Sequence, residues 1–181
     1  MRTRMILGLD PKTLVRLRDH LFDTGGRKSI FLAGAEAYEH QHPLEGDDEA
    51  IAYFEAVVEA MYLMVAADGK IEDSERQVVK GAVRELTANQ MRGAQIDELV
   101  AALDKRLAEE GQPKRLDAIC EVLKGRVEAS EAAFVLSAAV AFADNEIADA
   151  ENEIMNDLAD KLNISSERAE ALLDELETNE D

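Results

Sequence analysis

The chain has 181 residues, of which 46% are hydrophobic, and this is enough for one compact domain with its own core. Its 39 Asp and Glu residues against 20 Lys and Arg residues give a net charge of -19, which repels nucleic acids and other anions. A single cysteine, Cys120, excludes an intrachain disulfide and a CxxC metal or redox site. We therefore predict a cytoplasmic protein that binds no nucleic acid.

The start of the sequence and its apolar runs show whether a secretory signal or a membrane-spanning helix is expected. The first nine residues are too short and too polar for the apolar core of a secretory signal. The longest apolar run, residues 132–143, is interrupted only by Ser137 and is shorter than the roughly 20 residues that a membrane-spanning helix needs. We therefore expect no membrane span, and peripheral association with a membrane stays open.

Basic residues are concentrated at the N-terminus, where residues 1–28 contain seven Lys or Arg and three Asp or Glu. Asp10 followed by Pro11 is typical of a helix start, and Gly25 with Gly26 ends helical structure. The pattern predicts a basic amphipathic helix that either docks on the acidic body or binds a separate acidic surface. Its apolar stripe is Leu14, Leu17, Leu21 and Phe22.

A second short helix is predicted over residues 29–39, and a polar loop that contains Pro43 and Gly46 follows it. Proline and glycine interrupt helical structure, so this loop separates two parts of the chain. We therefore predict an N-terminal helical extension, residues 1–46, and a main helical domain, residues 47–181.

In the main domain, apolar residues recur at helical spacing. They predict a helix, an acidic turn and a second helix in each of two copies, about residues 50–87 and 127–163. Two further helices are predicted between the copies, over residues 94–110 and 113–124, and a last one over residues 166–177. No stretch alternates with a period of two. We therefore predict an all-α protein, an internally duplicated bundle of roughly seven to nine helices.

Two segments are predicted to lie in the core. Residues 132–143 are apolar on every side and rich in alanine, which is typical of a central helix surrounded by neighbours. Cys120 shares an apolar helical stripe with Ile119 and Leu123. A cysteine in such a stripe is more often a small core residue than a nucleophile, so we expect it to be inert.

The most informative pattern is an acidic turn that occurs twice. Residues 67–75 read ADGKIEDSE, and residues 143–151, each 76 positions later, read ADNEIADAE. Each copy matches only the second half of a calcium-binding loop, in which Asp, Gly and Glu follow at fixed spacing. Each copy is therefore at most half of a cation site, which the other copy or water must complete. The candidate metal ligands are Asp68, Asp73, Glu75, Asp144, Asp149 and Glu151.

The start and end signals of helices offer a competing interpretation of the same turns. Gly69 and, at the matching position, Asn145 suit a left-handed backbone at the end of a helix. Ser74 and Gln77 have the spacing of a capping box, and Asp149 can cap the helix of the second copy. Half of the repeated pattern is thus expected with no metal present.

Glu75 and Glu151 also suit this interpretation, because a negative charge stabilises the N-terminus of a helix. Helix capping does not explain why Asp68 and Asp144 recur. Cation binding and capping alone therefore both remain open, and these four carboxylates are where we look for function.

The duplicated turn resembles the TerB family of tellurite-resistance proteins and the wider TerB-like group, which includes the N-terminal region of a membrane-anchored DnaJ-like co-chaperone. The hallmark of the family is an Ala-Asp-Gly-x-Ile/Val turn before a Glu-containing helix start, present twice. Residues 65–71 with Glu75 fit this hallmark. Residues 141–147 with Glu151 fit it too, except that Asn145 replaces glycine. The resemblance covers most of the chain after the N-terminal extension.

The resemblance implies an all-α bundle whose acidic face binds a divalent cation, Ca²⁺ or Mg²⁺. It also implies protein partners, other tellurite-resistance proteins among them, and a role in stress or tellurite resistance without catalysis. We therefore expect a non-enzymatic acidic scaffold, with a metal-free adapter as the alternative. A metal-dependent hydrolase is disfavoured because the repeats contain no histidine. Since tellurite is an oxyanion and the chain is acidic, any resistance role is expected to be indirect.

Overall fold

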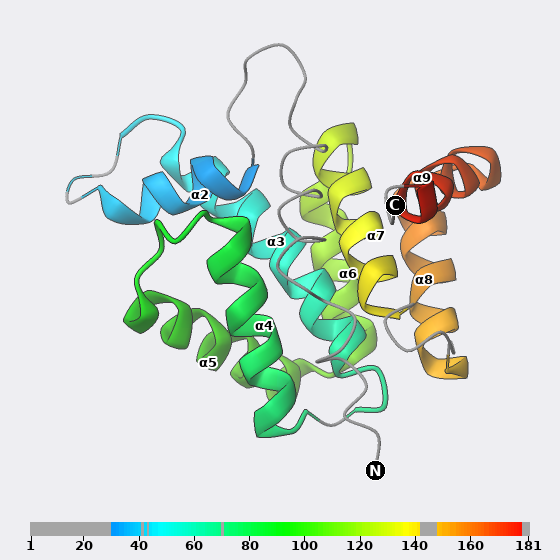
Figure 1. Cartoon of the computed structure of the whole chain (residues 1–181), viewed down its shortest axis with the longest axis horizontal. Helices are drawn as coiled ribbons and strands as arrows, with labels where there is room; N and C mark the ends of the chain where they lie inside the picture. The colour runs from blue at the N-terminus through cyan, green and yellow to red at the C-terminus, as the bar shows by residue number, and fades with distance from the viewer. Residues whose placement is uncertain (1–29, 41, 43, 70, 142–147, 179–181) are drawn as a thin grey trace.

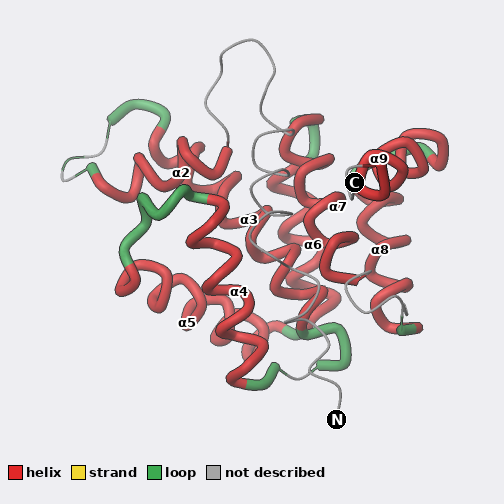
Figure 2. Tube along the Cα trace, viewed as in Figure 1, coloured by secondary structure: helices red, strands yellow, loops and turns green. Residues whose placement is uncertain are grey.

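The computed structural model of the chain describes residues 30–40, 42, 44–69, 71–141 and 148–178. This part forms eight α-helices and no strand, which confirms the predicted all-α class. Figure 2 shows the helices and the loops that connect them. The predicted basic helix near the N-terminus lies outside the described residues. The helices are α2 (Ile30–Glu39), α3 (Asp47–Val65), α4 (Asp73–Leu86), α5 (Gly93–Glu110), α6 (Gln112–Leu123), α7 (Val127–Ala141), α8 (Asp149–Lys161) and α9 (Ser166–Thr178).

The helices α3 and α7 pack against each other at the centre of the bundle (Figure 1). Almost every α3 residue from Phe54 to Val65 is buried, and so is almost every α7 residue from Ala129 to Ala141. A helix that is apolar on all sides must be surrounded by neighbours to bury its surface. The prediction of a central helix is therefore confirmed over the described part of residues 132–143.

The remaining helices surround this pair and bury one face each. In α4 the buried residues are Val79, Ala82, Val83 and Leu86, which follow one another at helical spacing. The helix α6 packs against α3, α5, α7 and α8, and so connects the two halves of the bundle. In the described part of the chain, no helix is both long and apolar enough to cross a membrane.

The helix α2 packs closely on α3. Phe31 and Phe54 meet edge to face, with ring centroids 6.3 Å apart. A Cβ atom at Gly34 would lie 2.5 Å from the Cβ atom of Phe54, so only glycine permits this approach. Although the sequence boundary at residue 46 grouped α2 with the N-terminal extension, α2 contributes Phe31 to the common core.

The internal duplication extends to a third helix in each copy. The helix α5 follows α4 as α9 follows α8. Glu55 on α3 contacts Arg106 of α5 at 3.6 Å, and Glu131, at the matching position of α7, binds Arg168 of α9 at 2.7 Å. When the starts of α5 and α9 are aligned, the buried residues Ile96, Leu99, Val100 and Leu103 match Ala169, Leu172, Leu173 and Leu176. The first repeat is therefore α3–α4–α5 and the second is α7–α8–α9, with α6 as the connector.

Candidate functional site

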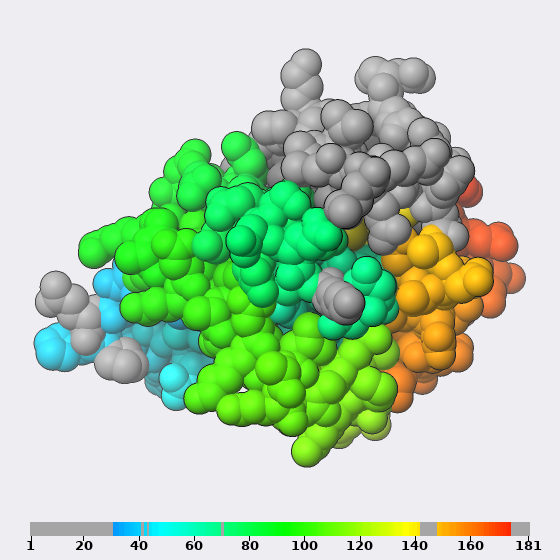
Figure 3. All heavy atoms as spheres, turned by 90° about the horizontal axis from the view of Figure 1, so that it is seen from below, coloured from blue at the N-terminus to red at the C-terminus, as the bar shows by residue number. Residues whose placement is uncertain are grey.

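The two acidic turns lead from the first to the second helix of each repeat. The first joins α3 to α4, and the second joins α7 to α8. In Figure 1 the end of α3, the start of α4, the end of α7 and the start of α8 all lie at the lower end of the bundle. Figure 3 views the molecule from this end. The duplication therefore brings the helix ends that flank both turns to the same end of the molecule.

The first turn is shaped by its backbone. The Gly69 N–H donates a hydrogen bond to the carbonyl oxygen of Ala66 at 2.8 Å, and Gly69 has a φ of 88°. The predicted need for a left-handed conformation at this glycine is confirmed, although the glycine lies three residues beyond the helix C-cap, Ala66. Asp68, directly before it, is exposed.

The glutamates Glu75 and Glu151 hold equivalent positions at the starts of α4 and α8. The Glu75 carboxylate accepts a hydrogen bond from the backbone N–H of Glu72 at 3.0 Å. In the second repeat, the Glu151 carboxylate accepts from the backbone N–H of Ala148 at 3.3 Å. Each glutamate thus satisfies a backbone donor that the helix leaves without an intrahelical partner. The recurrence of these two residues is explained by helix initiation, as the capping interpretation predicted.

The predicted cap residues themselves were wrong in both copies. The N-cap of α4 is Glu72, not Ser74, and the N-cap of α8 is Ala148, not Asp149. The extended backbone that defines an N-cap falls one or two residues earlier than the side-chain pattern indicated. Asp149 is instead the first residue of α8 and is exposed there.

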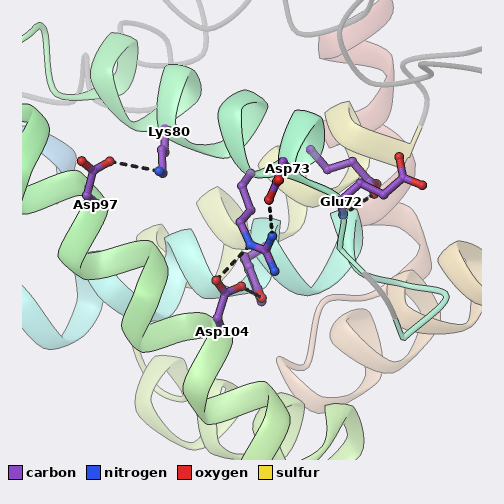
Figure 4. A network of polar contacts seen from close by, with 8 residues as sticks. Glu72, Asp73, Lys80, Asp97 and Asp104 are labelled. Carbon is purple, nitrogen blue, oxygen red and sulfur yellow. Dashed lines mark hydrogen bonds and ion pairs between the residues drawn. The ribbon is translucent and has the colours of Figure 1, made fainter.

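Asp73 belongs to a polar network that links three helices (Figure 4). Its carboxylate accepts a hydrogen bond from Nη1 of Arg76 at 2.7 Å. The Nε atom of Arg76 donates to Oδ2 of Asp104 on α5 at 2.9 Å, and the buried Tyr62 hydroxyl on α3 donates to Oδ1 of Asp104. Burial, together with this contact to Asp104, raises the pKa of the Tyr62 phenol. We call these four residues the Arg76 network.

The second turn differs from the first in what surrounds it. Asp144 lies outside the described residues, as do the other residues from 142 to 147. Asn152 occupies the position that matches Arg76, and it is exposed. Glu151 is fully buried at the start of α8, where the helix dipole favours its negative charge.

The chemistry of the candidate ligands suits a hard divalent cation, because all of them are carboxylates. Several of their oxygens already serve inside the protein: one oxygen of Glu75 and one of Glu151 hold helix starts, and one oxygen of Asp73 binds Arg76. In the part of the chain that the structure describes, no group of three or more His, Cys, Asp and Glu side chains is arranged to hold a metal ion. The metal assignment stays a prediction.

Sequence reasoning missed the ion pairs that tie the helices together. Besides the Arg76 network, Arg115 on α6 binds both oxygens of the buried Glu59 on α3, each at 2.8 Å, and Glu110 of α5 at 2.8 Å. The spacing of Asp73 and Arg76, three residues apart on one helix, was a usable signal. No local signal joins Tyr62 to Asp104, because 42 positions separate them.

Two other titratable groups have structural roles. Burial raises the pKa of the Cys120 thiol to about 11, which keeps it protonated and supports the expectation that it is inert. Nδ1 of His40 contacts Oδ2 of Asp47 at 2.8 Å, and the same oxygen accepts from the backbone N–H of Leu44 at 2.7 Å. The thiol is therefore a core group, and the His40–Asp47 contact joins the end of α2 to the start of α3.

These features define the class of protein: a duplicated all-α bundle in which an acidic sequence precedes the second helix of each repeat and a glutamate stabilises the start of that helix. The family model described as "Tellurite resistance protein TerB" matches residues 54–174, which is well over half of the chain. The chain therefore belongs to the TerB family, as the resemblance indicated. No curated protein and no solved structure matches it.

Proposed function

We propose that this TerB-family protein is a non-catalytic acidic scaffold that binds a divalent cation and a protein partner at the end of the bundle where α3 and α7 end and α4 and α8 begin. One observation carries the proposal. The duplication brings the ends of α3 and α7 and the starts of α4 and α8 to the same end, with Asp68 and Asp149 exposed there. Carboxylates from two half-sites can then share one ion, or each can hold an ion completed by water.

The charge of the chain supports an indirect role in tellurite resistance. A net charge of -19 repels an oxyanion such as tellurite, and the single thiol is buried with a raised pKa. Direct capture of tellurite is therefore a poor fit. A cationic ligand or a basic protein surface suits this charge, and a cation at the turns would set the shape of the surface that a partner meets.

Calorimetry with Ca²⁺ and with Mg²⁺ tests the cation part. The unaltered chain is expected to give saturable heat and a higher unfolding temperature with the preferred ion, because a ligand that binds only the folded state stabilises it. Asp68→Asn/Asp144→Asn should abolish both effects. Glu98→Gln/Asp160→Asn removes the same charge from exposed positions of α5 and α8 and should leave them intact. Absence of heat with the unaltered chain would exclude the cation.

A metal-free adapter is the second candidate, and the internal use of Asp73, Glu75 and Glu151 favours it. These carboxylates stabilise the protein with no ion present. An adapter of this kind should retain a protein partner in the presence of EDTA and lose it at high salt, which screens charge complementarity. Release of the partner by EDTA at low salt would instead favour the cation-dependent scaffold.

A further inference from the structure

One side of the central α3–α7 pair is covered by α6, which is the only described helix that packs closely on both members of the pair. Figure 3 shows α6, in yellow-green, on the lower side of that view. In Figure 1, α4 and α5 lie on one flank of the pair, and α8 and α9 lie on the other. Within the described residues, therefore, no helix lies across both α3 and α7 on the side opposite α6.

The side of the pair that faces away from α6 is nevertheless buried. Glu59 of α3 and Ser130 of α7 both bind α6. Met61 and Ala132 each follow two residues later, about 200° round the helix, so they point away from α6. Both are 0% exposed. Because a helix that is buried on every side must have neighbours on every side, a segment outside the described residues covers this side.

Only one such segment is long enough to lie across both central helices. Residues 1–29 precede α2, whereas the other segments outside the described residues have at most six residues. We infer that the basic amphipathic helix predicted for residues 11–24 docks on the side of the α3–α7 pair opposite α6. This docking does not depend on the cation binding proposed above.

The path of the chain permits this docking. Phe31, in the first turn of α2, packs on Phe54 of α3 with ring centroids 6.3 Å apart, so α2 begins beside the central pair. The linker of residues 25–29 can span at most about 17 Å. A helix over residues 11–24 would be about 21 Å long, which is comparable to α6. The segment can therefore return to the pair as soon as it leaves α2.

The composition of the segment suits the surface that we assign to it. Leu14, Leu17 and Leu21 form an apolar stripe that can pack on the apolar side of the pair. Residues 1–28 contain seven Lys or Arg and three Asp or Glu. The second repeat, residues 127–178, contains 14 Asp or Glu and only two Lys or Arg. Its charge attracts the segment to the body of its own chain before any separate acidic partner.

Hydrogen–deuterium exchange of the unaltered chain tests whether the segment is docked. A helix of this length is marginal in water by itself, so a free segment should exchange about as fast as a synthetic peptide of residues 10–24. We expect the amides of residues 14–24 to exchange at least roughly 100-fold more slowly than in the peptide, at every protein concentration. Exchange at the rate of the peptide would overturn the inference. Protection that disappears on dilution would also overturn it, because a second copy of the chain would then be the partner.

Substitutions on the two faces of the segment test the apolar contact. Leu17→Gln/Leu21→Gln removes two residues of the stripe, so it should accelerate exchange of the segment and lower the unfolding temperature by roughly 4–8 °C. Arg16→Gln/Asp23→Asn is the control, because it alters the opposite face at constant net charge and should have little effect. Equal effects of the two variants would contradict docking through the stripe.

Cross-linking tests the place of docking. In a Cys120→Ala background, which has no other thiol, a short bismaleimide should join Ala139→Cys within one molecule to a cysteine placed at residue 14, 17 or 21. Ala139 is suitable because it lies about 180° round α7 from Ser130, which binds α6. Glu121→Cys, at an exposed position of α6, is the control and should not be joined to the same residues. Joining to Glu121→Cys but not to Ala139→Cys would place the segment on α6 and overturn the inference.

Discussion

The two repeats share their helix order and their turns, but they are held together differently. In the first, α5 is bound by Lys80 to Asp97 at 3.0 Å and by the Arg76 network. In the second, Arg168 of α9 donates two hydrogen bonds to the Glu131 carboxylate of α7, at 2.7 and 2.8 Å. The duplicated sequence thus preserved the pattern that starts and ends helices, while the contacts between helices diverged.

The divergence is clearest inside the central helices. Glu59 of α3 is 2% exposed and binds Arg115, whereas the matching residue of α7 is Val135. One central helix therefore contains a buried charge that requires a partner, and the other is apolar at the same place. Four experiments follow, in order of decreasing expected effect: the first and last compare the repeats directly, and the other two test contacts that α3 makes with the chain before it.

The largest effect is expected at the buried ion pair. Arg115→Met leaves the Glu59 carboxylate buried without its bidentate partner, and we expect a loss of about 3–5 kcal/mol in the free energy of unfolding. Glu59→Val/Arg115→Met copies the apolar second repeat and should recover most of that loss. Urea unfolding measures both. A double variant as unstable as the single one would show that the pair does more than satisfy its own charges.

The contact between α2 and α3 comes next. Gly34→Ala places a methyl group 2.5 Å from the Cβ and Cγ atoms of Phe54, so overpacking should cost about 1–3 kcal/mol. Gly81→Ala is the matched control, because no atom lies within 4 Å of its added Cβ in α4. It should stabilise the protein by about 0.5–1 kcal/mol. Equal effects of the two substitutions in urea unfolding would contradict the close approach of α2.

At the start of α3, the Asp47 carboxylate contacts Nδ1 of His40 and the backbone N–H of Leu44, and we call this arrangement the Asp47 clasp. Its contribution to stability should depend on pH. The hydrogen bond from the Leu44 N–H, and then that from His40, lower the pKa of Asp47. A carboxyl whose pKa is lower in the folded state stabilises the protein above its unfolded pKa of about 3.9, and this contribution is lost as the pH falls through the folded value. Asp47→Asn should therefore lower the unfolding temperature at pH 6 and have progressively less effect below about pH 4.

The exposed neighbour Asp48 provides the control for this experiment. Asp48→Asn makes the same chemical change one residue away, without the two contacts of the clasp, and should lower the unfolding temperature less at pH 6. A difference between Asp47→Asn and the unaltered chain that stayed constant from pH 6 to pH 3 would contradict the lowered pKa.

The smallest effects are expected at the ion pairs that join the first and third helices of each repeat. Arg168→Gln breaks a bidentate but partly exposed pair with Glu131 and should cost about 0.2–1 kcal/mol at low salt. Arg106→Gln should cost less, because Arg106 and Glu55 are 3.6 Å apart. High salt should reduce both costs by screening. A larger loss for Arg106→Gln in thermal unfolding would reverse this comparison.

Much of the fold was predictable because its signals are local. Apolar residues at helical spacing placed the helices within a few residues, and the all-apolar run near residue 136 identified a central helix correctly. Helix caps were less accessible: Ser74 and Asp149 had suitable side chains, yet the backbone turned at Glu72 and Ala148. The N-cap is set by the residue at which the backbone becomes helical. The local sequence pattern predicts that residue only to within one or two positions.

In the candidate site, too, the residues with local sequence signals were predictable and the contacts between helices were not. Repetition alone selected Glu75 and Glu151, and the structure gives both the same role at a helix start. The partner of Asp73 was three residues away and within reach of local reasoning. Its link through Arg76 and Asp104 to Tyr62 required α3, α4 and α5 to be placed in space.

The sequence by itself determined the helical class, the duplication, the repeated acidic turn and the family, because these depend on spacing along the chain. Only the tertiary structure decided that α5 and α9 complete the repeats, that α2 joins the core, and that Glu59 is buried with Arg115. The physical reason is distance: an ion pair or a close helix contact joins residues dozens of positions apart, and its strength depends on burial that no local pattern encodes. The two repeats acquired different contacts of this kind, and only the first has a buried charge in its central helix, although the same turn occurs in both.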